Sequence, residues 1–282
     1  MPSWRVAVFT ALAALGRGLD LSASGLAYVA VGFLRREELC SAIAGRWEQF
    51  GATERHALSG FYPVEETFYP RFLKPHDEIL LVGCGTGRDL IALLRAGYHV
   101  EGLEVAPRAA MLARRILLEQ KLAAPIEIGS IETAPLRKRY DAVLFSWLCY
   151  SYIPGRAARV AVLCRVKAHL KAGGRILVTY VLCEREPRRL PRALARGIAQ
   201  VVRSRWTAEP TDVVSLDSHG IHFEHQFPAG ELEDEARQAG LRIVFDAPGD
   251  DKFAVLTAAE ASGRDGLRGG SDPRADGAPL GW

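Results

Sequence analysis

The pattern of apolar residues along the chain changes near residue 77. Before that point, residues 6–15 and 21–34 are two apolar runs, and in residues 35–50 apolar positions recur at helical spacing behind a charged start. Neither apolar run alone is long enough to span a bilayer. We therefore expect three helices, which together form a helical cap or lid over residues 1–60.

From residue 77 onward, short apolar runs alternate with helical patterns, which is typical of a parallel sheet covered by helices. The pattern predicts strands at 79–82, 99–105, 126–128, 141–146 and 175–181, and helices at 87–95, 107–121 and 156–170. Near the end, a helix is expected at 229–239, followed by strands 241–247 and 252–257. The short loop between these last strands makes them an antiparallel hairpin.

The expected α/β domain therefore covers residues 61–258. Residues 259–282 are rich in Gly, Asp, Arg and Pro and lack an apolar face, so we expect a disordered tail.

Between the fifth strand and the last helix lies an insertion rich in arginine. Its apolar residues, among them Leu194, Ile198 and Val201, recur at helical spacing, which predicts a basic amphipathic helix. Such a helix suits a solvated face, an acidic substrate or anionic lipid, and we favour the solvated face. A peripheral membrane contact stays open. The arginines of this insertion are Arg185, Arg188, Arg189, Arg192, Arg196, Arg203 and Arg205.

The composition indicates which kinds of partner the chain can be expected to bind. The 282 residues are 49% hydrophobic and carry a formal net charge of only +3, which gives no electrostatic reason to expect a nucleic acid partner. The five cysteines are widely spaced and form no C-x-x-C pair, so neither a disulfide framework nor a zinc site is indicated. We expect a cytoplasmic protein, with membrane association as the open alternative, that acts on a small-molecule substrate.

A glycine-rich turn, Gly83-Cys84-Gly85-Thr86-Gly87, leaves the first strand and opens a helix. Alternate glycines let the backbone approach a ligand closely, and the helix N-terminus offers unpaired N–H donors. The dinucleotide pattern G-x-G-x-x-G would place its last glycine at Arg88, one position later. Glu104 ends the next strand, where a carboxylate can accept hydrogen bonds from both ribose hydroxyls. A hydride-transfer cofactor remains the weaker alternative.

These residues resemble the class I methyltransferases that use S-adenosylmethionine (SAM). Residues 79–87 are similar to the family's first motif, 102–107 to the end of its second strand, and 140–144 and 170–178 to its fourth strand and fifth-strand entry. The resemblance covers about residues 60–258. It implies a Rossmann-like, doubly wound α/β sheet of seven strands with an antiparallel C-terminal hairpin strand, in addition to the N-terminal helical cap.

The resemblance also implies an enzyme that transfers a methyl group from SAM to an oxygen, nitrogen or sulfur atom of a small molecule. Two alternatives stay open: a non-catalytic SAM-binding regulatory or scaffold protein, and a methyltransferase acting on a membrane-associated quinone or lipid. In the family, the glycines border the methionine part of SAM, the acid holds the ribose and the loop after the third strand flanks the adenine. The implied cofactor-binding residues are Gly83, Cys84, Gly85, Thr86, Gly87, Glu104, Val105, Ser130, Ile131 and Ser146.

The chain lacks two motifs that are typical of particular kinds of methyl acceptor. After the fourth strand the chain reads Ser146-Trp147-Leu148-Cys149, without the Asp/Asn-Pro-Pro-aromatic turn of many amino-methylating enzymes. The acidic cluster of metal-dependent catechol chemistry is also missing there, so we predict no metal.

Aromatic residues follow the fourth strand and precede the first, where related enzymes line the acceptor pocket or close a segment over SAM. They are the pocket candidates, and Tyr150 is also a candidate catalytic residue; plain core packing is the competing interpretation. These aromatic candidates are Tyr62, Tyr69, Trp147 and Tyr152, and His225, just before the last helix, is a fifth pocket candidate.

Two histidines just before the last helix are candidates for proton removal, because histidine titrates near neutrality. In an extended segment His222 shares a face with Glu224, while Phe223, His225 and Phe227 occupy the opposite face. We therefore place His222 before His225 as the general base, although each histidine can simply fill the pocket wall or face solvent.

Overall fold

A computed structural model of the chain describes residues 3–18, 23–48, 53–183, 189–204, 206–247 and 252–259. Outside these ranges lie the expected tail from residue 260 onward, the loop 248–251 of the C-terminal hairpin, and Arg185, Arg188 and Arg205 of the insertion.

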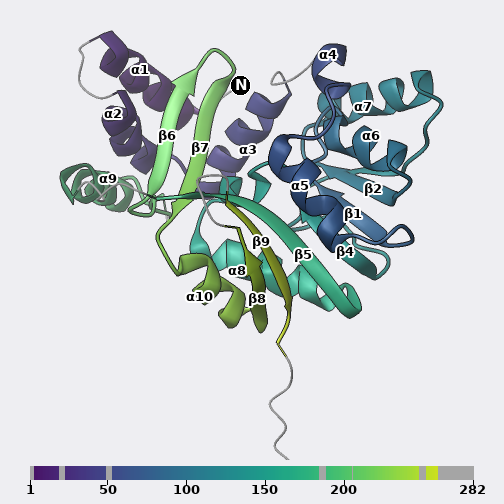
Figure 1. Cartoon of the computed structure of the whole chain (residues 1–282). Helices are drawn as coiled ribbons and strands as arrows, with labels where there is room; N and C mark the ends of the chain where they lie inside the picture. Colours follow the sequence, from purple (N-terminus) through teal and green to yellow (C-terminus); the bar gives the residue numbers. More distant parts are fainter. Residues whose placement is uncertain are drawn as a thin grey trace, which may run out of the picture.

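Five parallel strands form the centre of the molecule, in the order β3-β2-β1-β4-β5 (Figure 1). β9 (Lys252–Ala258) runs antiparallel beside β5, and β8 (Leu241–Asp246) pairs antiparallel with β9. This confirms the predicted sheet and its C-terminal hairpin. The parallel strands are β1 (Glu78–Val82), β2 (His99–Glu104), β3 (Ile126–Ile128), β4 (Tyr140–Phe145) and β5 (Leu170–Leu182).

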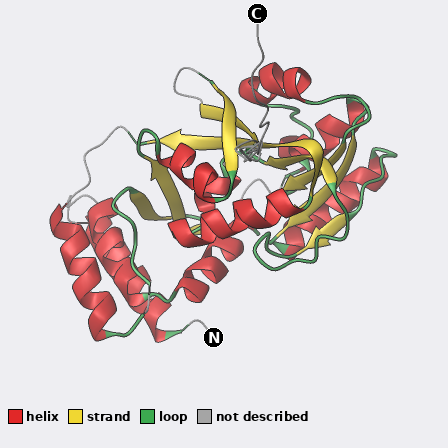
Figure 2. Cartoon of the chain, turned by 90° about the horizontal axis from the view of Figure 1, so that it is seen from below, coloured by secondary structure: helices red, strands yellow, loops and turns green. Residues whose placement is uncertain are grey.

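Helices cover both faces of this sheet, as the doubly wound arrangement requires (Figure 2). On one face, α5 (Pro63–Phe72), α6 (Arg88–Arg95) and α7 (Pro107–Glu119) bury their apolar sides in one hydrophobic cluster. On the other face, α8 (Arg156–Ala168) and α10 (Glu231–Gln238) contribute to a second cluster. Because both faces are covered, the central strands are buried along almost their whole length.

The prediction of seven strands is wrong, because the described residues alone form a sheet of nine. The insertion adds an antiparallel hairpin of β6 (Asp212–Asp217) and β7 (Gly220–Phe227), and β7 pairs with the end of β5 at Val181 and Leu182. β5 is 13 residues long and runs past β9, so its last residues are free to take a second partner. The sequence indicated one extended segment here but not the strand that pairs with it.

The N-terminal helices and the insertion build one cap together. α1 (Trp4–Gly18), α2 (Ala23–Ala30), the short 3-10 helix η1 (Val31–Phe33) and α3 (Arg36–Trp47) lie with α9 (Arg189–Val201) and the β6–β7 hairpin at one end of the molecule (Figure 1). Their apolar residues form a third cluster. It contains Phe9, Ala27, Leu39, Ile43, Ala195, Val214 and Phe223 among others. Within the described ranges, no helix is long and apolar enough to cross a membrane.

Candidate functional site

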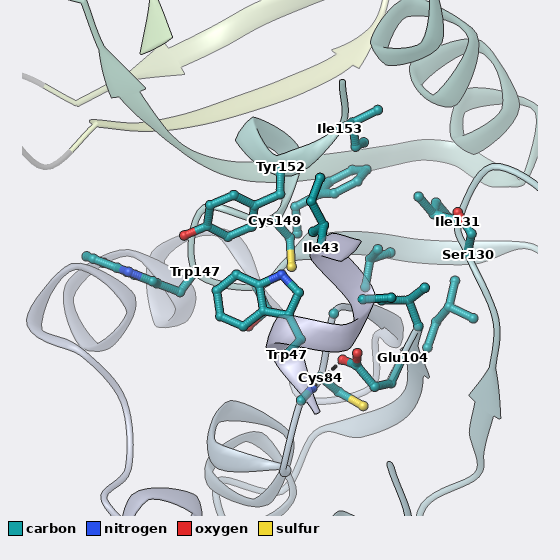
Figure 3. Close-up of a pocket in the computed structure, with 18 of the residues that line it drawn as sticks. Ile43, Trp47, Cys84, Glu104, Ser130, Ile131, Trp147, Cys149, Tyr152 and Ile153 are labelled. Carbon is teal, nitrogen blue, oxygen red and sulfur yellow. Dashed lines mark hydrogen bonds between the residues drawn. The ribbon is translucent and has the colours of Figure 1, made fainter. Parts of the chain in front are cut away.

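A cavity of about 190 Å³ opens at the carboxyl ends of β1, β2 and β4, under helix α3 (Figure 3). Parallel strands present their carboxyl ends at one edge of the sheet, and this edge is where α/β proteins bind ligands. The glycine turn after β1 and Glu104 at the end of β2 form one part of its wall. α3 covers the cavity with Cys40, Ile43, Ala44 and Trp47.

The glycine turn needs residues without a side chain for two different reasons. Gly85 has φ +53°, and a Cβ atom added there would meet nothing within 4 Å, so backbone strain and not crowding excludes other residues. Gly83 also has a positive φ, and the Cys149 thiol occupies the place that its Cβ atom would take. The turn therefore presents bare backbone to the cavity.

Glu104 is a buried carboxylate, 4% exposed, held by the backbone. Its Oε2 accepts a hydrogen bond from the Gly85 N–H at 2.7 Å, and its Oε1 accepts one from the Ala106 N–H at 2.8 Å. Burial raises the pKa of the carboxyl, whereas these two hydrogen bonds lower it. Each oxygen keeps acceptor capacity for a further donor, which suits the two neighbouring hydroxyls of a ribose.

The loop after β3 is fixed beside Glu104. The Gly129 N–H donates to the Glu104 backbone carbonyl at 2.8 Å, which brings Ser130 and Ile131 to the cavity wall next to Val105. These residues offer one hydroxyl and two apolar surfaces. Such a wall fits a planar, weakly polar group such as adenine.

The end of β4 is tied to the start of α6 by a buried hydrogen bond. Ser146 Oγ donates to Asp89 Oδ2 at 2.7 Å, and burial raises the pKa of this carboxyl. Both residues line the cavity. The neighbouring Arg88 forms an ion pair with Glu65 at 2.5 Å, and its guanidinium carbon lies 3.8 Å from the centre of the Tyr62 ring.

Arg88 and Asp89 were missed by the sequence analysis. The signal was present, because they are two adjacent charged residues directly before the apolar stretch of α6. Buried charges of this kind need partners. Here Arg88 pairs with Glu65 and contacts the Tyr62 ring, and Asp89 connects α6 to the end of β4 through its hydrogen bond with Ser146.

Four aromatic side chains, in addition to Phe145 of β4, line the rest of the cavity wall, and Figure 3 labels three of them, Trp47, Trp147 and Tyr152. The ring centroids of Tyr62 and Trp147 are 4.6 Å apart, and those of Trp47 and Tyr152 are 4.9 Å apart. Tyr62, Trp147 and Tyr152 were candidates for the pocket from the sequence, and in the structure all three line the cavity. Trp47 was missed because its helical spacing is equally typical of a core residue.

The structure brings together most of the other candidates. All the implied cofactor-binding residues line the cavity except Gly87, which begins α6 with φ +96° and packs against Ala113. Tyr69 also lies away from the cavity, because its ring is buried between Phe61 and Phe253.

Tyr150 and His225 lie in a buried network of charges instead of the cavity wall. The Tyr150 hydroxyl donates to Glu235 Oε2 at 2.7 Å, and Glu235 also pairs with the fully buried Arg159 at 2.7 Å. His225 Nδ1 lies 2.7 Å from Asp212 Oδ1. Burial lowers the pKa of His225, but hydrogen bonds to carboxylates outweigh it and raise the pKa to about 9. His225 is therefore a cation at neutral pH, and a poor base.

His222 lies behind the aromatic wall. Its ring centroid is 6.0 Å from that of Tyr152, and its Nε2 is 4.0 Å from Glu224 Oε2. The alternating burial along β7 confirms that these two residues share one face and that His225 belongs to the other. Burial, followed by the charge of Arg46, lowers the pKa of His222.

A different histidine, His56 of α4 (Glu54–Ala57), lines the cavity. Burial and the neighbouring charge of Arg88 lower its pKa, so the imidazole is neutral at pH 7. Sequence reasoning missed His56 because α4 is one turn long and carries no periodic pattern.

Comparisons with known proteins agree with this geometry. Residues 79–174 match the model of a methyltransferase domain family. A ubiquinone biosynthesis O-methyltransferase of Xylella fastidiosa is 29% identical over 213 residues, which cover 73% of this chain and 77% of that protein.

Solved structures share the fold. A SAM-dependent methyltransferase of Methanosarcina mazei superimposes with a TM-score of 0.54 at 18% identity, over 71% of this chain and 99% of that one. A glycopeptide N-methyltransferase solved with SAM gives a TM-score of 0.51 at 18% identity, over 71% and 88% of the two chains.

The sheet order, the glycine turn and the acid at the end of β2 have the arrangement seen in nucleotide-binding α/β folds. Residues 79–174 carry a methyltransferase domain, and the chain as a whole is similar to SAM-dependent methyltransferases. The chain is therefore an enzyme with a methyltransferase domain.

Proposed function

We propose that this methyltransferase transfers the methyl group of SAM to a hydroxyl group of a small, uncharged aromatic molecule. The observation that carries the proposal is the aromatic wall beside the glycine turn. Apart from Glu104 at the proposed ribose site, the charged side chains of the lining already have partners: Arg88 pairs with Glu65, Glu132 with Arg36, and Asp89 accepts a hydrogen bond from Ser146. An apolar, aromatic surface without an unpaired charge selects a flat, neutral acceptor.

A hydroxyl acceptor is supported by the name of the relative from Xylella fastidiosa, an O-methyltransferase. We therefore favour oxygen over nitrogen or sulfur as the accepting atom.

The cofactor site is proposed from the same residues. Glu104 offers acceptor capacity to a ribose diol, and Val105, Ser130 and Ile131 offer a wall for the adenine. The bare backbone of Gly85, where an added Cβ atom would meet nothing within 4 Å, leaves room for the methionine part. The donors and acceptors present therefore fit SAM.

When bound, SAM would supply a methyl group on a positively charged sulfur: the acceptor oxygen forms a bond to the methyl carbon, and the electrons of the broken sulfur–carbon bond stay on the sulfur. The contribution of the chain is alignment and exclusion of water. The paired rings of Tyr62 and Trp147 and of Trp47 and Tyr152 restrict a planar acceptor to one orientation. Aromatic faces also attract a cation, so this wall favours the charged sulfur.

The acceptor hydroxyl must also lose its proton. We propose His56 as the first candidate base because it lines the cavity and is neutral at pH 7. His222, with Glu224 on the same face, is the alternative and would serve an acceptor that reaches past Tyr152.

Calorimetry with SAM and its product S-adenosylhomocysteine tests the first half of this proposal. Transfer of a labelled methyl group to a matched set of phenol, aniline, thiophenol and cyclohexanol acceptors tests the second half. We expect label on the phenol. Labelling of the aniline alone, or of cyclohexanol as readily as phenol, would refute the proposed acceptor.

A second candidate is methylation of a lipophilic quinone precursor or lipid at a membrane. The apolar cavity wall and the relative named for ubiquinone biosynthesis favour it. A phenol with a long isoprenoid or alkyl tail should then show a higher kcat/KM than the same phenol without its tail. Equal kcat/KM values for the tailed and the tailless phenol would refute this second candidate and favour a small phenol without a tail as the substrate.

A further inference from the structure

Helix α1 is apolar on its outer face as well as its inner one. Of its described side chains, those exposed are Trp4, Ala7, Thr10, Ala11, Ala14 and Leu15. The Thr10 hydroxyl donates to the Val6 carbonyl at 2.9 Å, so even this polar group is turned to its own helix. A surface helix of a globular protein normally carries charged residues on its outer face. α1 therefore has the composition of a helix covered on both sides.

The inner face of α1 is already covered by the cap. Phe9 and Ala13 are buried in the cap's hydrophobic cluster, and Arg5 donates to the Val202 carbonyl at 2.8 Å. These contacts fix the helix and its orientation. They leave Trp4, 59% exposed, and Leu15, 55% exposed, on the side that faces away from the protein.

α9 lies at the same end of the molecule (Figure 1) and adds two more exposed apolar side chains. Leu194 and Val201 are 58% and 83% exposed and are seven residues apart, so they lie on one face of the helix. Ala195, on its inner side, belongs to the same buried cluster as Phe9 of α1. The outer sides of both helices therefore point away from one common core.

The outer helices of this end, α1, α2 and α9, are also basic, whereas the acids of the cap lie in α3 and in the β6–β7 hairpin. The sequences of α1, α2 and α9 contain five arginines and no aspartate, glutamate or lysine, although the whole chain has a net charge of only +3. Arg196 is exposed on α9, and Arg203 is exposed just after it.

We propose that the outer faces of α1 and α9, called here the docking surface, bind the surface of an anionic phospholipid bilayer. Exposed Trp and Leu side chains suit the boundary between headgroups and acyl chains, and arginines beside them suit lipid phosphates. A second copy of the chain fits less well, because a symmetric contact would bring the arginines of two docking surfaces together.

Membrane docking would act next to the active site. α3 joins the two, because Ile43 belongs to the cap's hydrophobic cluster and also lines the cavity. The inference goes beyond the proposed reaction and does not depend on which molecule is methylated.

Flotation with liposomes tests the docking surface without SAM or acceptor, so its outcome is separate from that of the methylation assays. The probes are vesicles of phosphatidylcholine alone and vesicles with a third phosphatidylglycerol, at low and high salt. Trp4→Glu with Leu15→Glu removes the apolar face of α1, and Arg196→Glu with Arg203→Glu reverses the charge. The matched control is Met111→Glu with Leu118→Glu, because these α7 side chains are 63% and 78% exposed at another place.

We expect the wild type to float with anionic vesicles at low salt and to be released at high salt. Both docking-surface variants should retain less than about a tenth of this bound fraction, and the control variant should match the wild type. The change at Trp4 and Leu15 should leave the melting temperature within a few degrees of the wild type, since both side chains are exposed.

Three results would overturn the proposal: wild-type protein that stays wholly soluble at low salt, a docking-surface variant that floats as well as the wild type, or a control variant that is released equally. A wild-type dimer that Trp4→Glu with Leu15→Glu converts to a monomer, without flotation, would assign the surface to a second copy of the chain.

Discussion

Replacing Glu104 with glutamine removes the charge of the proposed ribose acceptor while keeping the shape of the side chain. In the structure both carboxylate oxygens accept hydrogen bonds from backbone N–H groups, one of Gly85 and one of Ala106. An amide has one oxygen, so the variant can satisfy only one of these donors. The other N–H then faces the amide NH₂ group.

Two losses follow, and they can be measured separately. A buried donor left without a partner costs about 1–3 kcal/mol of stability, so the ligand-free variant should unfold more easily than the wild type. A hydrogen bond to a charged acceptor contributes about 1.5–3 kcal/mol, so the affinity for S-adenosylhomocysteine should fall by roughly ten- to a hundredfold.

Calorimetry with S-adenosylhomocysteine measures the affinity, and denaturant unfolding measures the stability. Glu132→Gln is the matched control, because Glu132 also lines the cavity but already pairs with Arg36. The affinity of the Glu132→Gln variant for S-adenosylhomocysteine should differ from that of the wild type by less than about fivefold, as expected for the loss of a partly exposed ion pair. Equal affinities for the Glu104→Gln variant and the wild type would refute the assignment of the ribose site.

Three further predictions concern the acceptor, the proton and the buried charges. Trp147→Leu should raise KM for an aromatic acceptor by about tenfold, as expected for the loss of an aromatic contact, and leave the calorimetric affinity for S-adenosylhomocysteine, whose sulfur is uncharged, unchanged; an unchanged KM would remove Trp147 from the acceptor wall. His56→Asn should lower kcat about 100-fold at neutral pH and flatten the pH-rate profile of a phenol, whereas His222→Asn should do so only if His222 is the base; unchanged profiles in both variants would leave alignment as the mechanism. Because the folded-state pKa of His225 is raised to about 9, the stability it contributes is complete below about pH 6.5 and is lost as pH rises through 9. The wild type should therefore lose up to about 3 kcal/mol relative to His225→Gln between pH 6.5 and 10 in urea unfolding, and parallel curves for the two proteins would contradict this pairing with Asp212.

The central sheet could be predicted because its strands are buried on both faces. A strand such as β1 must then be continuously apolar, and the glycine turn and helix that follow it carry their own local signals. Glu104 could be predicted from its place in the fold, because an acid at the carboxyl end of the strand after the glycine turn lies where a ribose is bound.

The cap could not be predicted in the same way, because its parts meet only in the folded chain. α2 packs on β6 and α9, which lie more than 150 residues away, and no local pattern records that pairing. β6 is six residues long and includes Asp212, Ser215 and Asp217, so its sequence does not alternate cleanly. The strand count was wrong for this reason.

The histidines show that the same is true of single site residues, because contacts between distant segments decide which of them reach the cavity. The alternation along β7 separated His222 from His225 correctly, but it did not show which face met the cavity. His56 reaches the cavity because α4 packs near α6, a contact between segments that the sequence does not link.

A crystal structure with S-adenosylhomocysteine bound tests the central claim most directly. We predict that both ribose hydroxyls lie within about 2.5–3.0 Å of the Glu104 carboxylate. We also predict that the adenine lies beside Val105 and Ile131, and that the sulfur faces the side of the cavity lined by Tyr62 and Trp147. A nucleoside bound elsewhere, or a ribose that does not touch Glu104, would contradict the site.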